Sequence, residues 1–309
     1  MNEKVLVLYG GLSKEREVSI RSGKAVAASL RRSGFIVKEF DFKGKIETVL
    51  ESFSPDVVFI ALHGKYGEDG TVQGALEIAG VPYTGSGVLA SAVCMNKFIT
   101  KKLFNSLDIE TAEFLSFHRG EKLFYNEIIR YLKSNKIVIK PVDQGSTIGV
   151  SIVDNEDDFK KGIKEAFTLS SNIIVEQFIN GKEITITVIG NNDDVIALPT
   201  IEIVPENDFY DYESKYVPGM SHHIIPARIS RVTDEKAKKN ALLIYKNFGL
   251  RDFARIDFIV SNGIPFALEV NTIPGFTETS LVPDAARAYG MTFDNLTTFV
   301  VNEALKRNK

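Results

Sequence analysis

The stretch Arg255-Ile-Asp-Phe-Ile-Val-Ser-Asn-Gly-Ile-Pro-Phe-Ala-Leu-Glu-Val-Asn271 predicts two antiparallel strands joined by a tight turn. Side chains along a strand alternate between the two faces of a sheet. Arg255 and Asp257 therefore share a face on the first strand, and Glu269 and Asn271 share a face on the second. Whether the two sets lie on the same side depends on the length of the turn.

The turn length fixes which residues face each other. A two-residue Asn-Gly turn would put Asp257 opposite Leu268, on the wrong parity. A three-residue turn over 261–263, with Gly in the left-handed position, pairs Asp257 with Ala267 and Arg255 with Glu269. We therefore predict the three-residue turn, which gathers two carboxylates, an amide oxygen and a guanidinium on one face.

These oxygen-bearing side chains are candidate metal ligands. Mg²⁺ prefers one or two carboxylates together with nucleotide phosphates, and Asp257, Glu269 and Asn271 offer such a set. The structural alternative is an exposed hairpin face with a cross-strand pair of Arg255 and Glu269. The apolar runs Phe-Ile-Val and Phe-Ala-Leu favour burial of the opposite face, which weakens that alternative.

A second pattern is the segment Lys140-Pro-Val-Asp-Gln-Gly-Ser-Thr-Ile-Gly149, in which a strand delivers a lysine to a Gly/Ser/Thr loop. Backbone N–H groups in such a loop can surround phosphate oxygens while the lysine supplies charge. The segment matches neither the G-x-x-x-x-G-K-[ST] nor the G-x-G-x-x-G motif. Taken alone, it is more typical of an ordinary Gly-rich connection between strands.

The segment Glu176-Gln-Phe-Ile-Asn-Gly-Lys-Glu183 offers the groups that a nucleoside requires. Adenine needs an acceptor for its exocyclic amine and a backbone donor for a ring nitrogen, and the ribose diol suits a carboxylate. Glu176, the backbone of Phe178 and Ile179, and Glu183 can supply them. The alternative is a plain β-hairpin with surface acids.

The first ninety residues alternate between short apolar runs and helical patterns. Strands are predicted at 5–9, 35–40 and 57–62, and helices at 17–33 and 45–53. This alternation predicts parallel β-α-β units and therefore an α/β, doubly wound sheet with ligands at the carboxyl ends of its strands.

The remaining elements are predicted from the same patterns. Helices are expected at 97–106, 121–133, 157–169, 234–248, 281–288 and 293–306, and strands at 137–140, 149–153, 173–178, 183–189 and 195–204. A polar, aromatic-rich loop is expected from 205 to about 225.

Four single residues have both a structural and a functional interpretation. Glu15 follows a Gly-Gly turn, where it can complement a helix dipole or bind a substrate ammonium. His63, at a strand end, can be a structural hydrogen-bonding group or a substrate contact. Lys97 resembles any solvated helix lysine, and Ser280 resembles a helix N-cap.

Composition limits the class of protein. The length of 309 residues suggests two or three domains, and 44% hydrophobic with 25% charged residues is typical of a globular protein. A net charge of −3 gives no bulk attraction to nucleic acid, and no apolar run reaches the length of a membrane span. The start MNEKVLVLYGG lacks the pattern of a signal peptide, and Cys94 is the lone cysteine. We therefore expect a soluble cytoplasmic protein that binds neither nucleic acid nor membranes.

Several segments, taken in order, resemble the ATP-grasp superfamily and, within it, the D-alanine–D-alanine ligase family. They are YGGLSKEREVS (9–19), LHGKYGEDGTVQG (62–74), GSGVLASAVCMNK (85–97), IKPVDQGSTIGV (139–150), VEQFINGKE (175–183), YDYESKY (210–216), ARIDF (254–258) and LEVNTIPGFTETSLVP (268–283). The resemblance covers nearly the whole chain, and the joint occurrence of these segments in this order is highly specific.

The resemblance implies an ATP-grasp fold of three α/β domains, at 1–94, 95–180 and 181–309. The nucleotide would lie between the central and C-terminal domains. It also implies ATP-dependent joining of two D-alanines through an acyl phosphate, two Mg²⁺ ions that Mn²⁺ can replace, a homodimer, and a cytoplasmic role in making peptidoglycan precursors.

The resemblance also implies individual roles. ATP would be bound by Lys97, Lys140, Glu176, Phe178, Ile179, Glu183 and Lys215, and the metals by Asp257, Glu269 and Asn271. D-Alanine would be bound by Glu15, His63 and Ser280, and catalysis would use Glu15, Ser146, Tyr216, Arg255, Gly275 and Ser280. Lys215 and Tyr216 would belong to a loop that closes the site, with Tyr216 linked to Glu15 through Ser146.

Two features depart from the family pattern. Asn96 stands where an Asp usually precedes the lysine, and Ser221-His-His-Ile224 ends the closing loop atypically. We expect His222 and His223 to point away from the second-substrate pocket. The competing hypotheses are a ligase for another second substrate such as D-lactate, a nucleotide-binding regulator without catalysis, and a small-molecule receptor.

Overall fold

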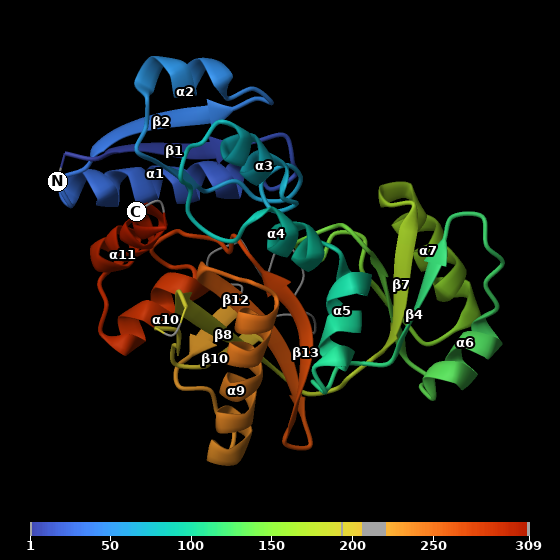
Figure 1. The fold of residues 1–309 in the computed structure, drawn as a ribbon. Helices are drawn as coiled ribbons and strands as arrows, with labels where there is room; N and C mark the ends of the chain where they lie inside the picture. Colours follow the sequence, from blue (N-terminus) through green and yellow to red (C-terminus); the bar gives the residue numbers. More distant parts are fainter. Residues whose placement is uncertain (1, 193, 206–220, 308–309) are drawn as a thin grey trace.

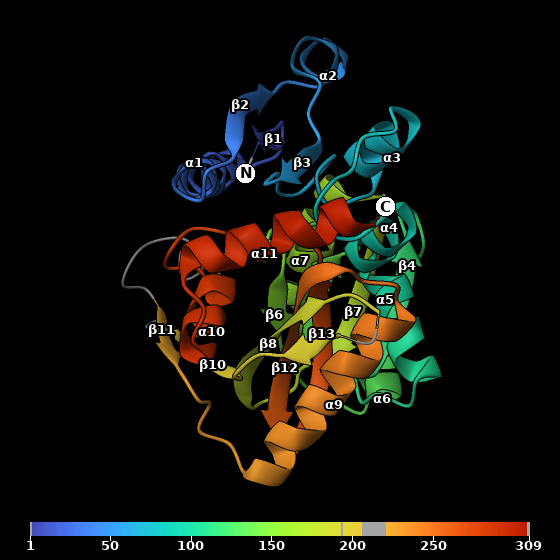
Figure 2. The ribbon, with the colours of Figure 1, turned by 60° about the vertical axis from the view of Figure 1, so that its left-hand side comes forward.

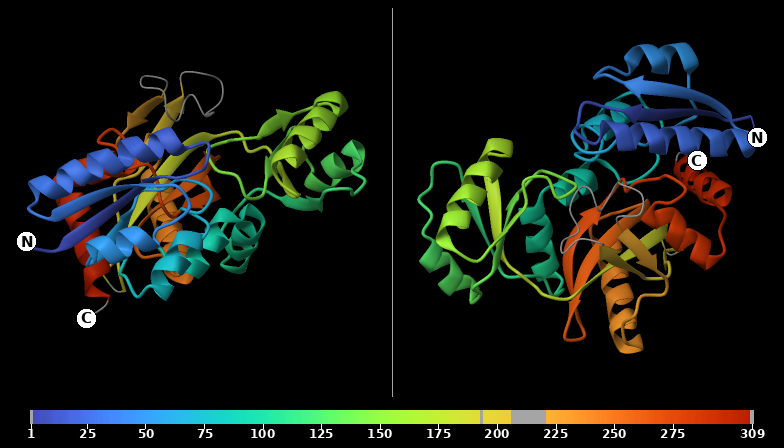
Figure 3. Two further views of the ribbon diagram at one scale, coloured as in Figure 1. Left: turned by 90° about the horizontal axis from the view of Figure 1, so that it is seen from above. Right: turned by 180° about the vertical axis from the view of Figure 1, so that it is seen from behind.

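The computed structural model describes residues 2–192, 194–205 and 221–307. Within these ranges the chain forms three sheets, which Figure 1 shows in blue, green and yellow-to-orange. The first is parallel, and the other two are antiparallel. Seen from above and from behind, the four-stranded sheet stands apart from the N-terminal one (Figure 3).

The N-terminal sheet has the strand order β2-β1-β3. Its elements are β1 (Lys4–Gly10), α1 (Arg16–Arg32), β2 (Ile36–Phe42), α2 (Glu47–Phe53) and β3 (Val57–Ile60). Helices α1 and α2 cover opposite faces (Figure 1), as right-handed crossovers in opposite directions require. The predicted doubly wound parallel sheet is confirmed.

Alternation along β1 produces two cores. Val5 and Val7 pack on the face shared with α1, whereas Leu6 and Leu8 pack on the other face. The first core also contains residues of α10 (Leu281–Tyr289) and α11 (Phe293–Lys306). Helix α11 lies between the N-terminal sheet and the largest sheet (Figure 2), so the two ends of the chain share one core.

The four-stranded sheet has the order β4-β7-β5-β6 and is covered by two helices. These elements are β4 (Phe114–His118), α6 (Tyr125–Leu132), β5 (Ile137–Pro141), β6 (Ser151–Val153), α7 (Glu156–Leu169) and β7 (Asn172–Gln177). Strand β4 was not predicted, and α6 begins four residues later than the expected 121.

The largest sheet has the order β11-β10-β8-β12-β13, with β9 on β8. Its strands are β8 (Lys182–Gly190), β9 (Ile196–Ala197), β10 (Ile201–Pro205), β11 (Ser221–Ile224), β12 (Asp252–Ser261) and β13 (Ile264–Asn271). Its face is covered by α9 (Arg231–Asn247) and by α4 (Val88–Met95) and α5 (Lys97–Ser106). Two helices were not predicted from the sequence: α3 (Thr71–Ile78) and α4. The single strand expected at 195–204 is split, because Pro199 lacks the N–H that a ladder needs.

The predicted hairpin register is wrong, although the predicted face is right. The turn has two residues, Asn262 and Gly263, both with positive φ (50° and 78°) as a type I′ turn requires. A β-bulge at Leu268 then adds one residue to the second strand and restores the parity. As a result Asp257 lies opposite Glu269, and Arg255 lies opposite Asn271.

Candidate active site

A cavity of about 110 Å³ lies between the four-stranded sheet and the β12–β13 hairpin. Six charged residues from the sequence analysis line it: Lys97, Lys140, Glu176, Glu183, Asp257 and Glu269. The walls between them are mainly apolar, with Val138, Ile152, Phe178, Ile179 and Ile259 among the lining residues. Apolar walls with a few convergent polar groups are typical of a ligand site.

Lysines dominate one side of this cavity. Lys140 forms an ion pair with Glu176 Oε1 on the neighbouring strand, and Lys101 Nζ lies 2.9 Å from Glu176 Oε2. Burial by itself raises the pKa of Glu176, but the two lysine charges outweigh it and lower the pKa to about 2. Lys97 Nζ donates to Gln144 O at 2.6 Å and so holds the loop that follows Lys140.

The hairpin carries the carboxylates of the other side. Arg255 donates to both oxygens of Asp257, at 2.9 Å each, and Asn271 Nδ2 donates to Asp257 Oδ2 at 3.0 Å. Thr185 on β8 donates to Asp257 Oδ1 at 2.6 Å. These bonds fix the position of the carboxylate at the cavity wall.

The donor set fits Mg²⁺ by its chemistry. Asp257 and Glu269 face each other across the hairpin, and Asn271 contacts Asp257. Two carboxylates and an amide oxygen are hard ligands, and Mg²⁺ completes its shell with phosphates and water. In the described part of the chain, no group of three or more His, Cys, Asp or Glu side chains that could hold a metal ion is found, so this set would depend on Asn271 and on ligands from outside the protein.

Glu15 occupies the N-cap position of α1, but its side chain makes no capping hydrogen bond. Only 5% of Glu15 is exposed, and Ser146 Oγ donates to Glu15 Oε1. The loop of Ser146 and the loop after β3 both crowd the carboxylate: an added Cβ at Gly145 would lie 3.4 Å from Glu15 Oε2, and one at Gly64 would lie 2.8 Å from it. Ser146 and Thr147 both have positive φ, a strained conformation that is concentrated at functional sites.

His63 follows β3 and contacts both α1 and the segment just after β13. Its Nδ1 lies 3.0 Å from Ile273 O, and its Nε2 lies 3.4 Å from Ser22 Oγ on α1. Burial lowers the pKa of His63, against the opposing effect of Glu15. Burial therefore favours the neutral form of the ring.

Ser280 also occupies an N-cap position, at the start of α10, and also makes no capping bond. Its hydroxyl instead contacts Thr277, with the Thr277 N–H donating to it at 3.1 Å. An added Cβ at Gly275 would lie 3.3 Å from Ser280 Oγ, so the structure brings these two predicted residues together. By contrast, Asn96 caps α5 by accepting from Ile99 N at 3.1 Å, which explains why Asn can replace Asp there.

The loop predicted to close the site lies partly outside the described residues. Lys215 and Tyr216 both fall in 206–220, so their predicted roles rest on the sequence. After this gap, His223 Nδ1 lies 2.6 Å from Asp284 Oδ2, in the first turn of α10.

The sequence analysis missed three residues of the site. Lys101 and Thr185 contact Glu176 and Asp257 directly, and Glu68 accepts from Gly64 N at 2.7 Å. Burial, with the charge of Glu15, raises the pKa of Glu68 to about 8. The local sequence does not distinguish Lys101 from an ordinary helix residue or Thr185 from an ordinary strand residue. Glu68 could have been found, because it lies in a Gly-rich loop at the end of a strand, where ligands bind in such sheets.

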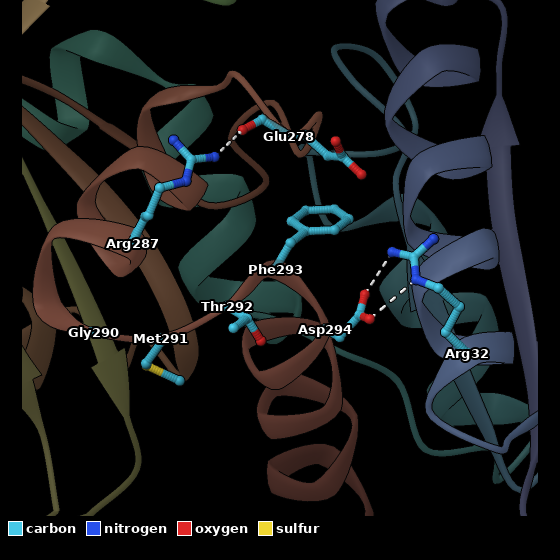
Figure 4. A pocket seen from close by; sticks show the side chains of 8 residues that line it. All are labelled: Arg32, Glu278, Arg287, Gly290, Met291, Thr292, Phe293 and Asp294. Carbon is cyan, nitrogen blue, oxygen red and sulfur yellow. Dashed lines mark hydrogen bonds and ion pairs between the residues drawn. The ribbon is translucent and has the colours of Figure 1, made fainter.

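A second hollow lies between α1 and the α10–α11 turn (Figure 4). Its two arginines are already engaged, because Arg32 pairs with Asp294 at 2.6 Å and Arg287 pairs with Asp284 at 2.7 Å and donates to Glu278 O. The pairing neutralises the charge, so this hollow lacks the convergent unbalanced charges of the first cavity.

Fold and site together define a protein of the ATP-grasp class. Models of the D-ala D-ala ligase N-terminus and C-terminus match residues 38–86 and 103–302. A D-alanine–D-alanine ligase of Carboxydothermus hydrogenoformans is 46% identical over 95% of each chain, and one of Desulforudis audaxviator is 45% identical over 99% of this chain and 100% of that one.

Solved structures agree with these matches. The D-alanine–D-alanine ligase of Bacillus anthracis complexed with ATP has a TM-score of 0.86 at 31% identity, covering 99% of this chain and 98% of that one. VanG D-Ala:D-Ser ligase of Enterococcus faecalis has a TM-score of 0.84 at 30% identity, covering 98% and 100%. The chain belongs to the D-alanine–D-alanine ligase family.

Proposed function

We propose that this chain joins two D-alanine molecules into D-alanyl-D-alanine, converting ATP to ADP and phosphate. The observation that carries the proposal is the cavity with lysines on one wall and paired carboxylates on the other, in a chain of this family. A triphosphate needs positioning and charge neutralisation for phosphoryl transfer, and these walls supply both.

ATP binds with its base at the Glu176–Glu183 end of the cavity. Glu176 accepts from the exocyclic amine of adenine, and Glu183 binds the ribose diol. Phe178 N–H donates to Lys136 O at 3.1 Å, so we assign the ring-nitrogen contact to the N–H of Ile179. Lys97, Lys140 and, from the closing loop, Lys215 bind the phosphates.

Asp257, Glu269 and Asn271 would hold two Mg²⁺ ions, for which Mn²⁺ can substitute. Bound metal would neutralise the phosphate charge that develops during transfer. Arg255 and Thr185 orient the carboxylate of Asp257 for this role, since both donate to it.

The reaction has two steps. The carboxylate of the first D-alanine attacks the γ-phosphorus of ATP, ADP leaves, and an acyl phosphate forms. The second D-alanine, once its ammonium has lost a proton, attacks the acyl carbon, and phosphate leaves from the tetrahedral oxyanion. Arg255 and the N–H of Gly275 stabilise that oxyanion.

The substrates are held at the helix starts. Glu15 binds the ammonium of the first D-alanine, with His63 beside it, and Ser280 binds the carboxylate of the second. Ser146 links Glu15 to Tyr216 in the closing loop. The proximity of Ser146 to Glu15 and of Gly275 to Ser280 supports this arrangement.

The wider assignments follow from the family. We propose domains at 1–94, 95–180 and 181–309, each of which contains one of the three sheets. We also propose a cytoplasmic homodimer that supplies peptidoglycan precursors. Among the described residues, no helix is both long enough and apolar enough to span a bilayer.

The test is phosphate release from ATP with a panel of D- and L-amino acids, D-serine and D-lactate included, with each product identified by mass. We expect phosphate release and a dipeptide mass with D-alanine alone. ATP turnover with another acceptor only, or no turnover with D-alanine, would refute the proposed function.

A further inference from the structure

Lys101 is a buried lysine outside the roles assigned above. Its side chain is 1% exposed, and its Nζ lies 2.9 Å from Glu176 Oε2 and donates to Thr111 Oγ1 at 2.6 Å. The same Nζ lies 5.4 Å from the ring centroid of Phe114. A buried ammonium is costly unless it is paired, so this position is specified by several neighbours at once.

The two lysines on Glu176 are not equivalent. Lys140 lines the cavity and pairs with Oε1, whereas Lys101 pairs with Oε2 from behind and does not line the cavity. Lys140 can therefore be drawn to a ligand, but Lys101, enclosed by Thr111 and Phe114, remains with Glu176.

Further carboxylates also lie near this cluster. Glu113 lies near Lys101, and Glu183 and Glu269 lie near Lys140. Glu176 therefore depends on these two lysines to stay ionised against its burial. If Lys140 turns to the phosphates of a nucleotide, Lys101 is the cation that still pairs with Glu176.

We propose that Lys101 is a positioning residue for base recognition, which keeps Glu176 ionised and turns Oε1 towards the cavity as an acceptor for the amine of adenine. This inference rests on the proposed function and adds to it the means by which the base is selected. An ionised carboxylate only accepts hydrogen bonds. It binds the 6-amino group of ATP and repels the 6-oxo group of inosine triphosphate.

Loss of Lys101 would weaken that selection. Without it, Glu176 would take up a proton when Lys140 engages the nucleotide, and a protonated carboxyl can donate to a 6-oxo group. The Lys101→Met variant should raise KM for ATP and lower the preference for ATP over inosine triphosphate, in kcat/KM, by roughly tenfold or more, the scale of one hydrogen bond to a charged group. The kcat with ATP should change by less than the KM, because the reacting phosphate lies at the other end of the nucleotide.

Lys102→Met is the matched control, since Lys102 is the next residue on the same helix and is exposed. The experiment measures kcat and KM for ATP and inosine triphosphate in the wild type and both variants, with the melting temperature of each. The preference should fall in Lys101→Met alone. An unchanged preference in a folded, less stable Lys101→Met would show a purely structural role and overturn the inference.

A second variant keeps the test decisive if Lys101→Met does not fold. Thr111→Val removes one partner of Lys101 and should shift the preference in the same direction by a smaller factor. In a Glu176→Gln background, Lys101→Met should add no further change, because Lys101 acts through the carboxylate. Additive effects would overturn the inference. Failure of the proposed function is distinct, because the wild type would then form no D-alanine dipeptide with ATP.

Discussion

The two walls of the cavity differ in the sign of their excess charge. Beside Glu176 on the four-stranded sheet lie two lysines, Lys140 on β5 and the buried Lys101 on α5. On the hairpin, Asp257 and Glu269 outnumber Arg255, and Lys97 of α5 lies 3.6 Å from Glu269. A triphosphate between them is attracted by one wall and repelled by the other. The difference teaches that the hairpin needs added positive charge in order to face phosphates, whereas the side with the lysines needs none.

The largest expected effect comes from neutralising the carboxylate wall. Glu269→Gln keeps the shape of the side chain but removes the charge of a proposed metal ligand, so turnover at low Mg²⁺ should fall by roughly 10³-fold, which corresponds to several kcal/mol of charge stabilisation. Removal of divalent metal with a chelator should have a similar or larger effect on the wild type. Phosphate release as a function of Mg²⁺ concentration is the measurement.

Glu235→Gln is the control for that variant, since Glu235 pairs with Arg231 on the exposed side of α9. It should behave like the wild type at every Mg²⁺ concentration. Normal activity of Glu269→Gln at low Mg²⁺ would contradict the difference between the two sides of the cavity, because the hairpin would then not depend on a cation.

The next largest effect concerns Arg255, the cation on the hairpin beside Asp257. Arg255→Ala should lower kcat by roughly 10²-fold or more, the scale of losing one oxyanion donor. It also removes two hydrogen bonds from Asp257. Arg228→Ala, which breaks a pair with Glu202 at the opposite edge of the same sheet, should leave kcat unchanged. A change limited to KM for ATP would make Arg255 a binding residue only.

The hairpin shows where prediction from sequence stops. Alternation correctly placed Arg255, Asp257, Glu269 and Asn271 on one face, but the predicted three-residue turn is wrong. The bulge at Leu268 restores the parity that a two-residue turn would lose. Leu268 has the sequence character of any strand residue, so only the pairing with β12 identifies it as the extra residue.

The same limit applies to single side chains. Glu15 and Ser280 stand at helix starts where the sequence allows capping, and only the structure shows that neither side chain caps. Lys101 follows the pattern of a surface helix, and its burial arises from Thr111 and Phe114, which come later in the chain. Periodicity predicts elements, but contacts between distant elements decide which polar side chains belong to a site.

A smaller effect separates binding from capping. Ser280→Ala should raise KM for the second D-alanine by roughly tenfold, the scale of a hydrogen bond to a charged group, with little loss of stability. Thr292→Ala removes a true cap, since Thr292 accepts from Asn295 N at 3.1 Å at the start of α11. It should cost about 1 kcal/mol of unfolding free energy without changing KM.

Steady-state kinetics with D-alanine and chemical denaturation of both variants check this pair of effects. These measurements give the contribution of an uncharged contact in the same site, with which the effects of the charged residues on the two sides of the cavity can be compared. If Ser280→Ala loses stability and keeps its KM, Ser280 is a structural partner of Thr277 and not a substrate contact.

The smallest expected effect concerns the choice of second substrate. A D-alanine amine must lose a proton before it attacks, and a cation beside it would favour the hydroxyl of D-lactate instead. His223 contacts α10, because its Nδ1 lies 2.6 Å from Asp284 Oδ2. The carboxylate in contact with His223 offsets positive charge on its ring at pH 8 and at pH 6 alike, so His223 adds little net field. We therefore expect D-alanine to outcompete equimolar D-lactate at both pH values, as resolved by product mass.

His223→Gln should shift the product ratio by less than roughly fivefold, the scale of an ion pair near the surface. A depsipeptide as the main product at pH 8 would refute the preference for D-alanine. A switch to depsipeptide at pH 6 that His223→Gln abolishes would show that this histidine acts on the second substrate in spite of Asp284.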